Sequence, residues 1–318
     1  MSTAAALLVI VLPVFLLVGF GYGAVRTGIF PDRAVDGLIR FATHIAVPVL
    51  LFRALYTLDL GAAIRVDHLL SFYGAAAVCF AGAILLARLV WKRRPGVAVA
   101  IGFSALFSNS VLLGLPIATR AYGEGALEPV FAIIAFHAPV CYLLGILTME
   151  FARRDGDPAA AALRRSASAM FRNALTVGIV LGAALNLAGV PLPGPLWAMI
   201  DMLAEAALPV ALFGLGGVLT RYALRAEMGE ALMVAAFSLV VHPGLAWLLT
   251  AQVFGLPPEF VRGAVVIAAM PPGVNGYVFA AMYGRAEGTA ASAVLLATAL
   301  SVVSVTVWLW LLGGAALG

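Results

Sequence analysis

Two stretches of the chain place prolines, glycines and an asparagine inside apolar runs. They are "FSNSVLLGLPIATRAYG" at 107–123 and "MPPGVNGYVFAAMYG" at 270–284. Proline lacks a backbone N–H and disfavours the α conformation in the preceding residue, so each stretch predicts an interrupted helix. Where a helix restarts, its first N–H groups have no acceptor within the helix and carry a partial positive charge that attracts anions. The two stretches therefore predict a pair of anion-binding helix ends.

The residues around these interruptions are the candidate binding residues. Asn109 and Asn275 can donate and accept hydrogen bonds, or cap the restarted helices. Taken alone, each stretch favours an ordinary proline kink that has a satisfied cap, whereas the pair favours a binding site. The predicted substrate-binding set is Asn109, Ser110, Gly114, Pro116, Pro271, Pro272, Asn275 and Gly276.

The composition indicates where these helices lie. Of 318 residues, 64% are hydrophobic and 11% are charged, and the mean hydropathy is +1.08, whereas soluble domains carry roughly 25% charged residues. The net charge is +4, and the charged residues cluster in short connections between apolar runs. This favours lipid headgroups over nucleic acid as their neighbours. Cys79 and Cys141 lie in separate apolar runs, so neither a disulfide nor a metal site is expected, and no cofactor is predicted. The composition predicts an all-α integral membrane protein.

The chain divides into about ten apolar segments long enough to cross a membrane, since a crossing needs about 20 residues. The first has no basic residue before it, so we interpret it as a spanning helix and not as a cleaved signal peptide. The segments are 5–23, 34–56, 69–91, 97–122, 128–150, 170–190, 196–219, 229–254, 259–283 and 290–312.

The distribution of basic residues predicts the orientation. With ten crossings both termini lie on one side, and of the 19 Lys and Arg residues that side receives only Arg53, Arg65, Arg120 and Arg262. Because cytoplasmic connections are rich in Lys and Arg, both termini are expected outside the cytoplasmic membrane. The segment 151–169 is then a cytoplasmic linker, either a solvated connection or a regulatory segment.

The two halves of the chain show a weak internal repeat. Shifting the sequence by 161 residues places "LIRFATHIAVPVLLF" (38–52) on "MIDMLAEAALPVALF" (199–213), with Pro48 on Pro209 (209 − 48 = 161), and it places Gly114 on Asn275. We expect five helices in 1–150 and five in 170–318. An odd number per half gives an inverted-topology repeat, in which interrupted helices at corresponding positions mark a transporter binding site.

The motifs "NSVLLGLP" and "MPPGVNGYVFAAMYG", together with ten predicted helices, resemble the auxin efflux carrier family, which includes malonate-type permeases. The resemblance implies a fold similar to bile-acid symporters and sodium/proton antiporters. Helices 1, 2, 6 and 7 would form a scaffold, usually dimeric, and helices 3–5 and 8–10 a transport domain with crossed, broken helices 4 and 9. It further implies elevator-like movement of organic anions such as dicarboxylates or indole acids.

Ionisable side chains within spanning helices are functional candidates because they are expensive at membrane depth. The 161-residue offset places Arg40 on Asp201 and His44 on Glu205. In an inverted repeat Arg40 and Asp201 would be about 15 Å apart along the membrane normal, whereas His44 and Glu205 could meet near the centre. These residues, and His137, are candidates for proton coupling or for an interface. For His137 and His242 a structural role is favoured over coupling, and Arg53 and His68 are expected to snorkel near the outer membrane face.

Three other function classes fit the sequence less well. An intramembrane enzyme would need a catalytic motif such as HExxH or GxSxG, and the sequence has neither. A sodium/proton antiporter of related fold remains the main alternative, although neither interruption contains the carboxylate that it would need. A channel would need a continuous polar stripe, whereas the polar residues concentrate at two points.

Overall fold

The structure is a computed structural model that describes residues 3–152, 174–224 and 227–313. Most of the predicted linker 151–169 lies outside the described residues. The described chain is helical throughout, apart from turns and one isolated β-bridge. It separates into two compact units, which are described individually. The small unit consists of 13–64 and 168–221, and the large unit of 1–12, 65–167 and 222–318.

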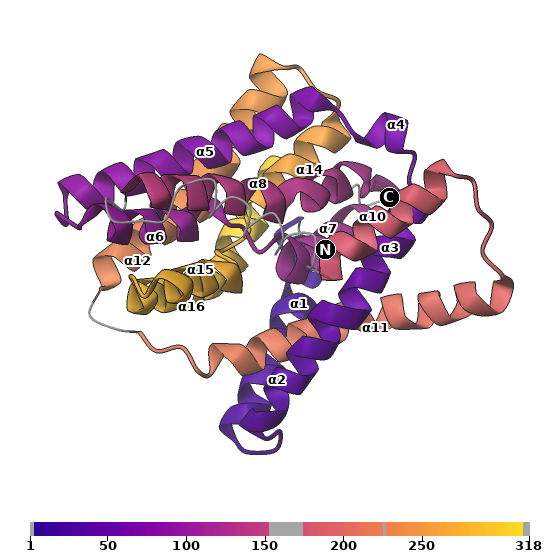
Figure 1. Ribbon diagram of the computed structural model, residues 1–318, viewed down its shortest axis with the longest axis horizontal. Helices are drawn as coiled ribbons and strands as arrows, with labels where there is room; N and C mark the ends of the chain where they lie inside the picture. Colours follow the sequence, from indigo (N-terminus) through magenta and orange to yellow (C-terminus); the bar gives the residue numbers. More distant parts are fainter. Residues whose placement is uncertain (1–2, 153–173, 225–226, 314–318) are drawn as a thin grey trace. The chain divides into compact units, whose positions relative to one another are not determined.

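The small unit is built from helices of both halves of the sequence. Helix α1 begins in the large unit, and the boundary falls at Pro13. Helix α3 packs against both α10 and α11, as Figure 1 shows for α3 and α10. The elements are α1 (Thr3–Arg26), α2 (Asp32–Phe41), the π-helical η1 (Ala42–Ala46), α3 (Val47–Thr57), α4 (Leu60–Ala63), α10 (Ala174–Leu187) and α11 (Gly194–Leu219).

Glycines let the helices of the small unit approach to backbone contact. A Cβ at Gly182 would overlap the carbonyl oxygen of Phe52, and a Cβ at Gly21 would overlap that of Phe213. Small residues at such contacts are typical of helices packed in membranes, because burying apolar surface against a partner gains little over burying it in lipid.

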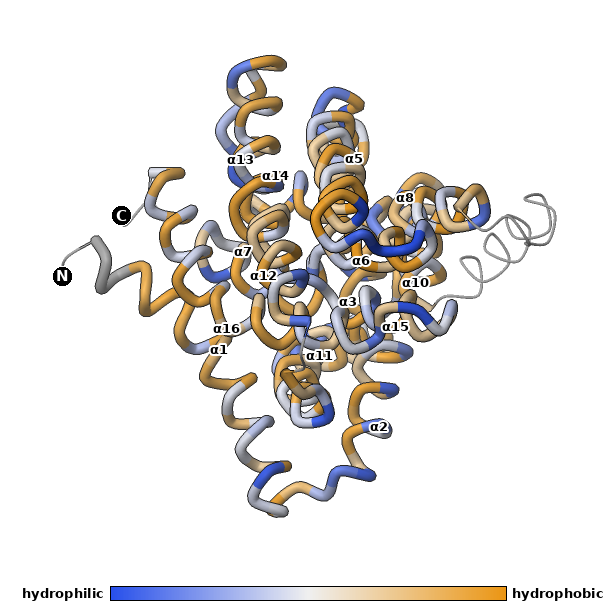
Figure 2. Tube along the Cα trace, turned by 90° about the vertical axis from the view of Figure 1, so that its left-hand side faces the viewer, coloured by the Kyte–Doolittle hydropathy of each residue, from blue (hydrophilic) through white to orange (hydrophobic). Residues whose placement is uncertain are grey.

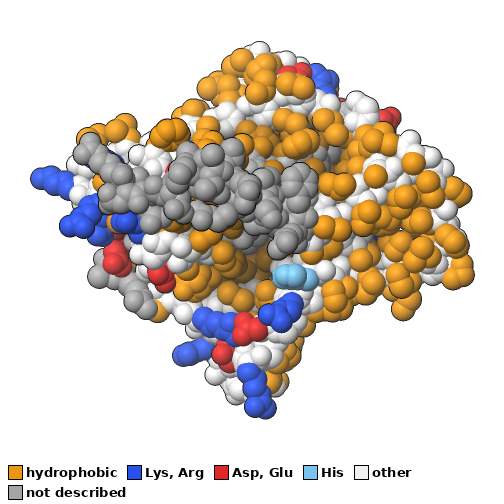
Figure 3. All heavy atoms as spheres, in the orientation of Figure 1, with side chains coloured by type: hydrophobic (Ala, Val, Ile, Leu, Met, Phe, Trp, Pro, Cys, Tyr) orange, Lys and Arg blue, Asp and Glu red, His pale blue; other side chains and the backbone are white. Residues whose placement is uncertain are grey.

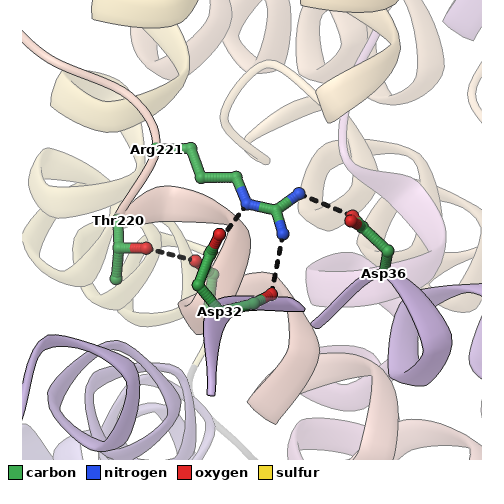
Figure 4. A network of polar contacts seen from close by, with 5 residues as sticks. Asp32, Asp36, Thr220 and Arg221 are labelled. Atoms are coloured by element: carbon green, nitrogen blue, oxygen red, sulfur yellow. Dashed lines mark hydrogen bonds and ion pairs between the residues drawn. The ribbon is translucent and has the colours of Figure 1, made fainter. Parts of the chain in front are cut away.

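An arginine joins the end of α11 to the start of α2 (Figure 4). Arg221 donates from Nε to Asp32 Oδ1 at 2.9 Å, from Nη1 to Asp36 Oδ1 at 2.5 Å and from Nη2 to the Asp32 carbonyl at 2.9 Å. Hydrogen bonds to Asp36 and Asp32 raise the pKa of Arg221 above its ordinary value. Asp32 lies in the first turn of α2, where the helix dipole also favours negative charge.

The large unit contains the remaining elements. Helix α5 packs on α6, α12 on α16, and α15 on both α6 and α16, and Figure 1 shows α15 beside α16. The elements are α5 (Val66–Leu89), α6 (Pro95–Leu106), η2 (Ser110–Gly114), α7 (Leu115–Tyr122), η3 (Glu124–Ala126), α8 (Glu128–Ala152), α12 (Met228–Ala236), η4 (Phe237–Val241), α13 (His242–Trp247), η5 (Leu248–Val253), α14 (Pro258–Ala268), α15 (Val274–Tyr283) and α16 (Glu287–Leu311).

A buried ion pair fixes the connection between α5 and α6 to the start of α12. Arg93 donates from Nε to Glu230 Oε1 at 2.5 Å and from Nη2 to Oε2 at 3.0 Å. The Glu230 side chain is 1% exposed and that of Arg93 is 39% exposed. The hydrogen bond to Glu230 raises the pKa of Arg93.

Seven helices of the described chain are long and apolar enough to cross a membrane. They are Leu7–Arg26, Asp32–Thr57, Val66–Leu89, Glu128–Ala152, Gly194–Leu219, Met228–Val253 and Glu287–Leu311. The other three predicted segments are the interrupted pairs α6 with α7 and α14 with α15, and the shorter α10.

Hydropathy follows this helical pattern. Figure 2 shows hydrophobic residues along the helices and hydrophilic ones gathered near helix ends, as between α1 and α2. On the face in Figure 3, broad areas are hydrophobic, and Lys, Arg, Asp and Glu side chains form small groups. The protein is therefore an integral membrane protein, as the composition predicts.

Candidate functional site at the crossing of two broken helices

The two interrupted helices cross at their breaks within the large unit. Helix α6 ends at Leu106, and α14 ends at Ala268. Ser108 and Pro272 then form an antiparallel β-bridge. Its hydrogen bonds run from the Asn109 N–H to the Pro271 carbonyl and from the Gly273 N–H to the Phe107 carbonyl, each at 2.9 Å. Backbone groups freed by one break are thus satisfied by the other, as a low-dielectric surrounding requires.

Both chains restart as helices immediately after the bridge. Asn109 precedes η2, which continues into α7, and Gly273 precedes α15. Neither of these N-cap positions has a side-chain capping hydrogen bond. Asn109 therefore does not use its amide as a helix cap, which was one of the two roles considered for it.

The asparagines have different surroundings. Asn109 is 6% exposed, and Asn275 is half-buried in the first turn of α15. The Tyr142 hydroxyl of α8 donates to Asn275 Oδ1 at 3.2 Å. Tyr142 is a site neighbour that sequence reasoning missed, because no spacing rule connects a tyrosine in the fifth segment to an asparagine in the ninth.

The other predicted site residues lie around the same crossing. Ser110 is buried, and its N–H donates to the Ser108 carbonyl at 2.8 Å. A Cβ at Gly114 would lie 3.1 Å from Met270 Cγ, and one at Gly276 would lie 3.1 Å from Ser104 Oγ.

The three prolines near the crossing have different roles at the two breaks. Pro271 and Pro272 lie within the second break, where the sequence predicts that the helix opens. Pro116 instead occupies the first turn of α7, so it does not open the helix. The first break lies at Phe107–Asn109, upstream of the proline.

The crossing contains no charged side chain, and it brings together two helix N-termini and the C-terminal ends of α6 and α14, which carry the opposite partial charge. The stretches 107–116 and 270–276 contain no ionisable residue. The N-termini of the helices that start at Ser110 and Val274 each present N–H groups without intrahelical acceptors, equivalent to about half a positive charge apiece. Such an arrangement favours an anionic group near the asparagine amides.

His137 supports the crossing from α8. Its Nε2 lies 3.1 Å from the carbonyl oxygen of Ser108, the bridge residue, and its ring packs on Phe107 with centroids 4.7 Å apart. A carbonyl only accepts, so His137 carries a proton on Nε2 and donates it. Sequence reasoning singled out His137 but offered no partner for it.

The remaining ionisable candidates lie in the small unit. Arg40, His44 and Glu205 are exposed, and among the described residues no ion pair joins His44 to Glu205. Asp201 pairs instead with Arg53, with Nη1 and Oδ1 3.3 Å apart. This contact was not anticipated, because the offset argument matched Asp201 only with Arg40.

His68 and the possible metal ligands lie as follows. His68, which was expected near the outer surface, is fully buried and hydrogen-bonded through Nε2 to the Pro129 carbonyl at 3.1 Å. In the part of the chain that the structure describes, no group of three or more His, Cys, Asp or Glu side chains is placed to hold a metal ion.

Comparison with known proteins identifies the family. The family described as "Membrane transport protein" matches residues 6–309. A "Putative malonate transporter" of Rhizobium meliloti is 32% identical over 97% of this chain and 96% of its own length. "Auxin efflux carrier component 5" of Arabidopsis thaliana is 22% identical over 91% of this chain and 92% of its own length. A transporter of Methanothermobacter thermautotrophicus is 25% identical over 94% of this chain and 96% of its own length. The chain is a membrane transporter rather than an enzyme, and it belongs to the membrane transport protein family that includes the auxin efflux carriers.

Proposed function

We propose that this protein is a secondary transporter of a small organic anion and that it holds a carboxylate where the two broken helices cross. The observation that carries the proposal is the Ser108–Pro272 bridge, after which both segments restart as helices. The free N–H groups at their N-termini can bind a carboxylate without a lysine or arginine at membrane depth. The binding set is the one predicted from the sequence, centred on Asn109 and Asn275.

The names of the relatives support this substrate class. One relative is named for malonate, a dicarboxylate, and others are named for auxin, an indole acid. Both ligands carry a carboxylate, which is the group that helix N-termini and amide donors recognise. We therefore assign the class to carboxylates.

The division into two units supports an elevator-like mechanism. The small unit combines most of the first predicted segment with the second, sixth and seventh, and the large unit combines the others. We propose that the small unit is the scaffold and that the large unit carries the substrate across the membrane.

We further propose ten crossings in two inverted repeats, in the cytoplasmic membrane with both termini outside. The pairs α6 with α7 and α14 with α15 would each make one crossing, and α10 another. A recurring contact supports the repeat: Gly21 meets Phe213, and Gly182 meets Phe52. The two glycines are 161 residues apart (182 − 21 = 161), and so are the two phenylalanines (213 − 52 = 161), which is the offset between the halves of the sequence.

Substitution of Asn275 tests the location of the site and the sign of its ligand's charge. We expect Asn275→Ala to weaken carboxylate binding about ten- to a hundredfold, because a hydrogen bond to a charged group contributes about 1.5–3 kcal/mol. Asn275→Asp should weaken it further, since it adds a negative charge at almost unchanged volume. The measurement is calorimetric titration of purified protein with malonate and with indole-3-acetate.

The control is Thr306→Val, which alters a half-buried hydroxyl of α16 bonded to its own helix. It should leave the affinity unchanged. Equal affinities in wild type, Asn275→Ala and Asn275→Asp would remove the crossing as the site, and tighter sodium binding by Asn275→Asp would favour the antiporter alternative.

A further inference from the structure

A histidine in the large unit is bonded directly to the crossing. The His137 Nε2–H donates to the Ser108 carbonyl, and Ser108 bridges to Pro272. The other ring nitrogen, Nδ1, lies 3.8 Å from Cys141 Sγ, so the thiol can donate to it when the ring is neutral. One nitrogen of His137 is therefore committed to the crossing, and the other can accept a proton.

A second histidine lies beside it without a hydrogen-bond partner. His242, the first residue of α13, is fully buried, and neither ring nitrogen has a hydrogen-bond partner among the described residues. The Phe72 backbone lies near it without hydrogen-bonding geometry. The Phe72 ring contacts both histidines, with centroids 5.0 Å from His242 and 5.8 Å from His137. A buried polar ring without partners costs free energy and calls for an explanation.

The ionisable groups around the two histidines are few. Tyr73 of α5 stacks near His137, and its hydroxyl donates to the Ile133 carbonyl. Cys141 of α8 is the other neighbour. The neighbouring elements α6, η2, η4 and η5 contain no ionisable side chain.

Charged or titratable groups also lie on α5 and α14, which pack against the helices that carry the histidines. On α5, Asp67 pairs with Arg65, and His68 is bonded to Pro129. On α14, Arg262 lies over the ring of Tyr122, and Glu259 lies in the first turn. Among the described residues, none of these forms an ion pair with His137 or His242.

We propose that His137 and His242 together take up one proton when a carboxylate binds at the crossing, so that anion and proton move together. The inference rests on the proposed function, because the bound anion supplies the counter-charge. A buried imidazolium without a counter-charge is strongly disfavoured, and two adjacent ones are disfavoured further. The negative charge of a bound anion offsets the positive charge of the added proton, and the Ser108 carbonyl strengthens its bond to a cationic His137.

The coupling between proton and anion is reciprocal, and this determines how carboxylate affinity changes with pH. If anion binding favours the proton, the proton must favour the anion by the same factor. Carboxylate affinity therefore falls as pH rises, by up to about tenfold per pH unit when one proton is taken up per anion. His137 and His242 act as coupling residues in this scheme and do not touch the substrate.

Calorimetry of wild-type protein in two buffers of different ionisation enthalpy counts the protons taken up. Malonate and indole-3-acetate are suitable probes above about pH 7, because their own carboxyl groups are then ionised. We expect about one proton per bound anion in wild type. In His137→Gln and His242→Gln, proton uptake should be lost and the affinity should no longer vary with pH.

The matched control is His68→Gln, which removes an equally buried histidine of the large unit that is also bonded to a carbonyl. Its proton uptake should equal that of wild type. Carboxylate binding without proton uptake in wild type would overturn this inference and leave the proposed function intact, whereas no binding of either carboxylate would overturn both. If the glutamine variants fail to fold, the proton count in wild type still decides the question.

Discussion

At the scale of single residues, glycines decide how closely the helices of the small unit approach. Gly21 and Gly182 each face a backbone carbonyl, whereas Gly23, in the same helix as Gly21, has no atom within 4 Å of an added Cβ. A side chain at the first two positions must push two backbones apart. At Gly23, by contrast, packing does not require the absence of a side chain.

Alanine at these positions should therefore have opposite effects. We expect Gly21→Ala and Gly182→Ala each to destabilise the protein by about 1–3 kcal/mol, the usual range for overpacking. Gly23→Ala should be neutral or stabilising by up to about 1 kcal/mol, because alanine is the better helix former. Thermal unfolding in detergent measures the order, and a lower melting temperature for Gly23→Ala than for Gly21→Ala would contradict the packing argument.

At the scale of helices, three prolines follow a widened, π-helical turn. The π-helical segments η1, η2 and η4 end at Ala46, Gly114 and Val241, each two residues before a proline: Pro48, Pro116 and Pro243. Proline lacks the N–H and crowds the carbonyl four residues earlier, and a wider turn relieves that crowding. The helix can then continue with little kink, which explains why Pro116 does not create the break near it.

This behaviour limits what the sequence could predict. Pro271 and Pro272 mark the second break correctly, and the apolar runs give the helices almost to their ends. The position of the first break was not predictable from Pro116, since the same residue type merely widens a turn at Pro48. The pairings of Asp201 with Arg53 and of His137 with Ser108 depend on helix rotation and depth, which an offset between halves does not specify.

The ion pair between the α5–α6 connection and α12 offers a second test. Arg93→Ala leaves the Glu230 carboxylate buried without a partner. Such a loss costs about 3–5 kcal/mol in a fully buried pair, and less here because Arg93 is partly exposed. The double variant Arg93→Leu with Glu230→Leu should recover most of the stability in thermal unfolding. A double variant less stable than Arg93→Ala would show that the unpaired Glu230 carboxylate is not the cause of the loss.

At the scale of the whole molecule, the small unit exposes polar groups within spans that would otherwise face lipid. Glu205 is exposed on the face of α11 that carries Met199 and Met202, and His44 is exposed on η1. A carboxylate facing hydrocarbon is expensive. We propose that a second copy of the chain covers this face, giving a homodimer through the small unit.

Substitution on this face should change the oligomeric state. Met202 is 73% exposed, and we expect Met202→Trp to shift the purified protein from dimer towards monomer because a bulky ring disturbs a packed interface. Leu16→Trp on α1, at a position 60% exposed, is the matched control and should leave the dimer intact. Light scattering in detergent gives the masses; a monomeric wild type, or a Met202→Trp dimer as stable as the control, would contradict the proposal.

The bridge at the crossing is made only of main-chain atoms, through the Pro271 and Phe107 carbonyls and the Asn109 and Gly273 N–H groups. Side-chain substitutions do not remove those atoms unless a proline replaces one of the two donors. Evolution can therefore vary the side chains that face the ligand while the frame that presents the helix ends persists. Selectivity among carboxylates should then diverge through a few substitutions near the crossing, without remodelling of the helices.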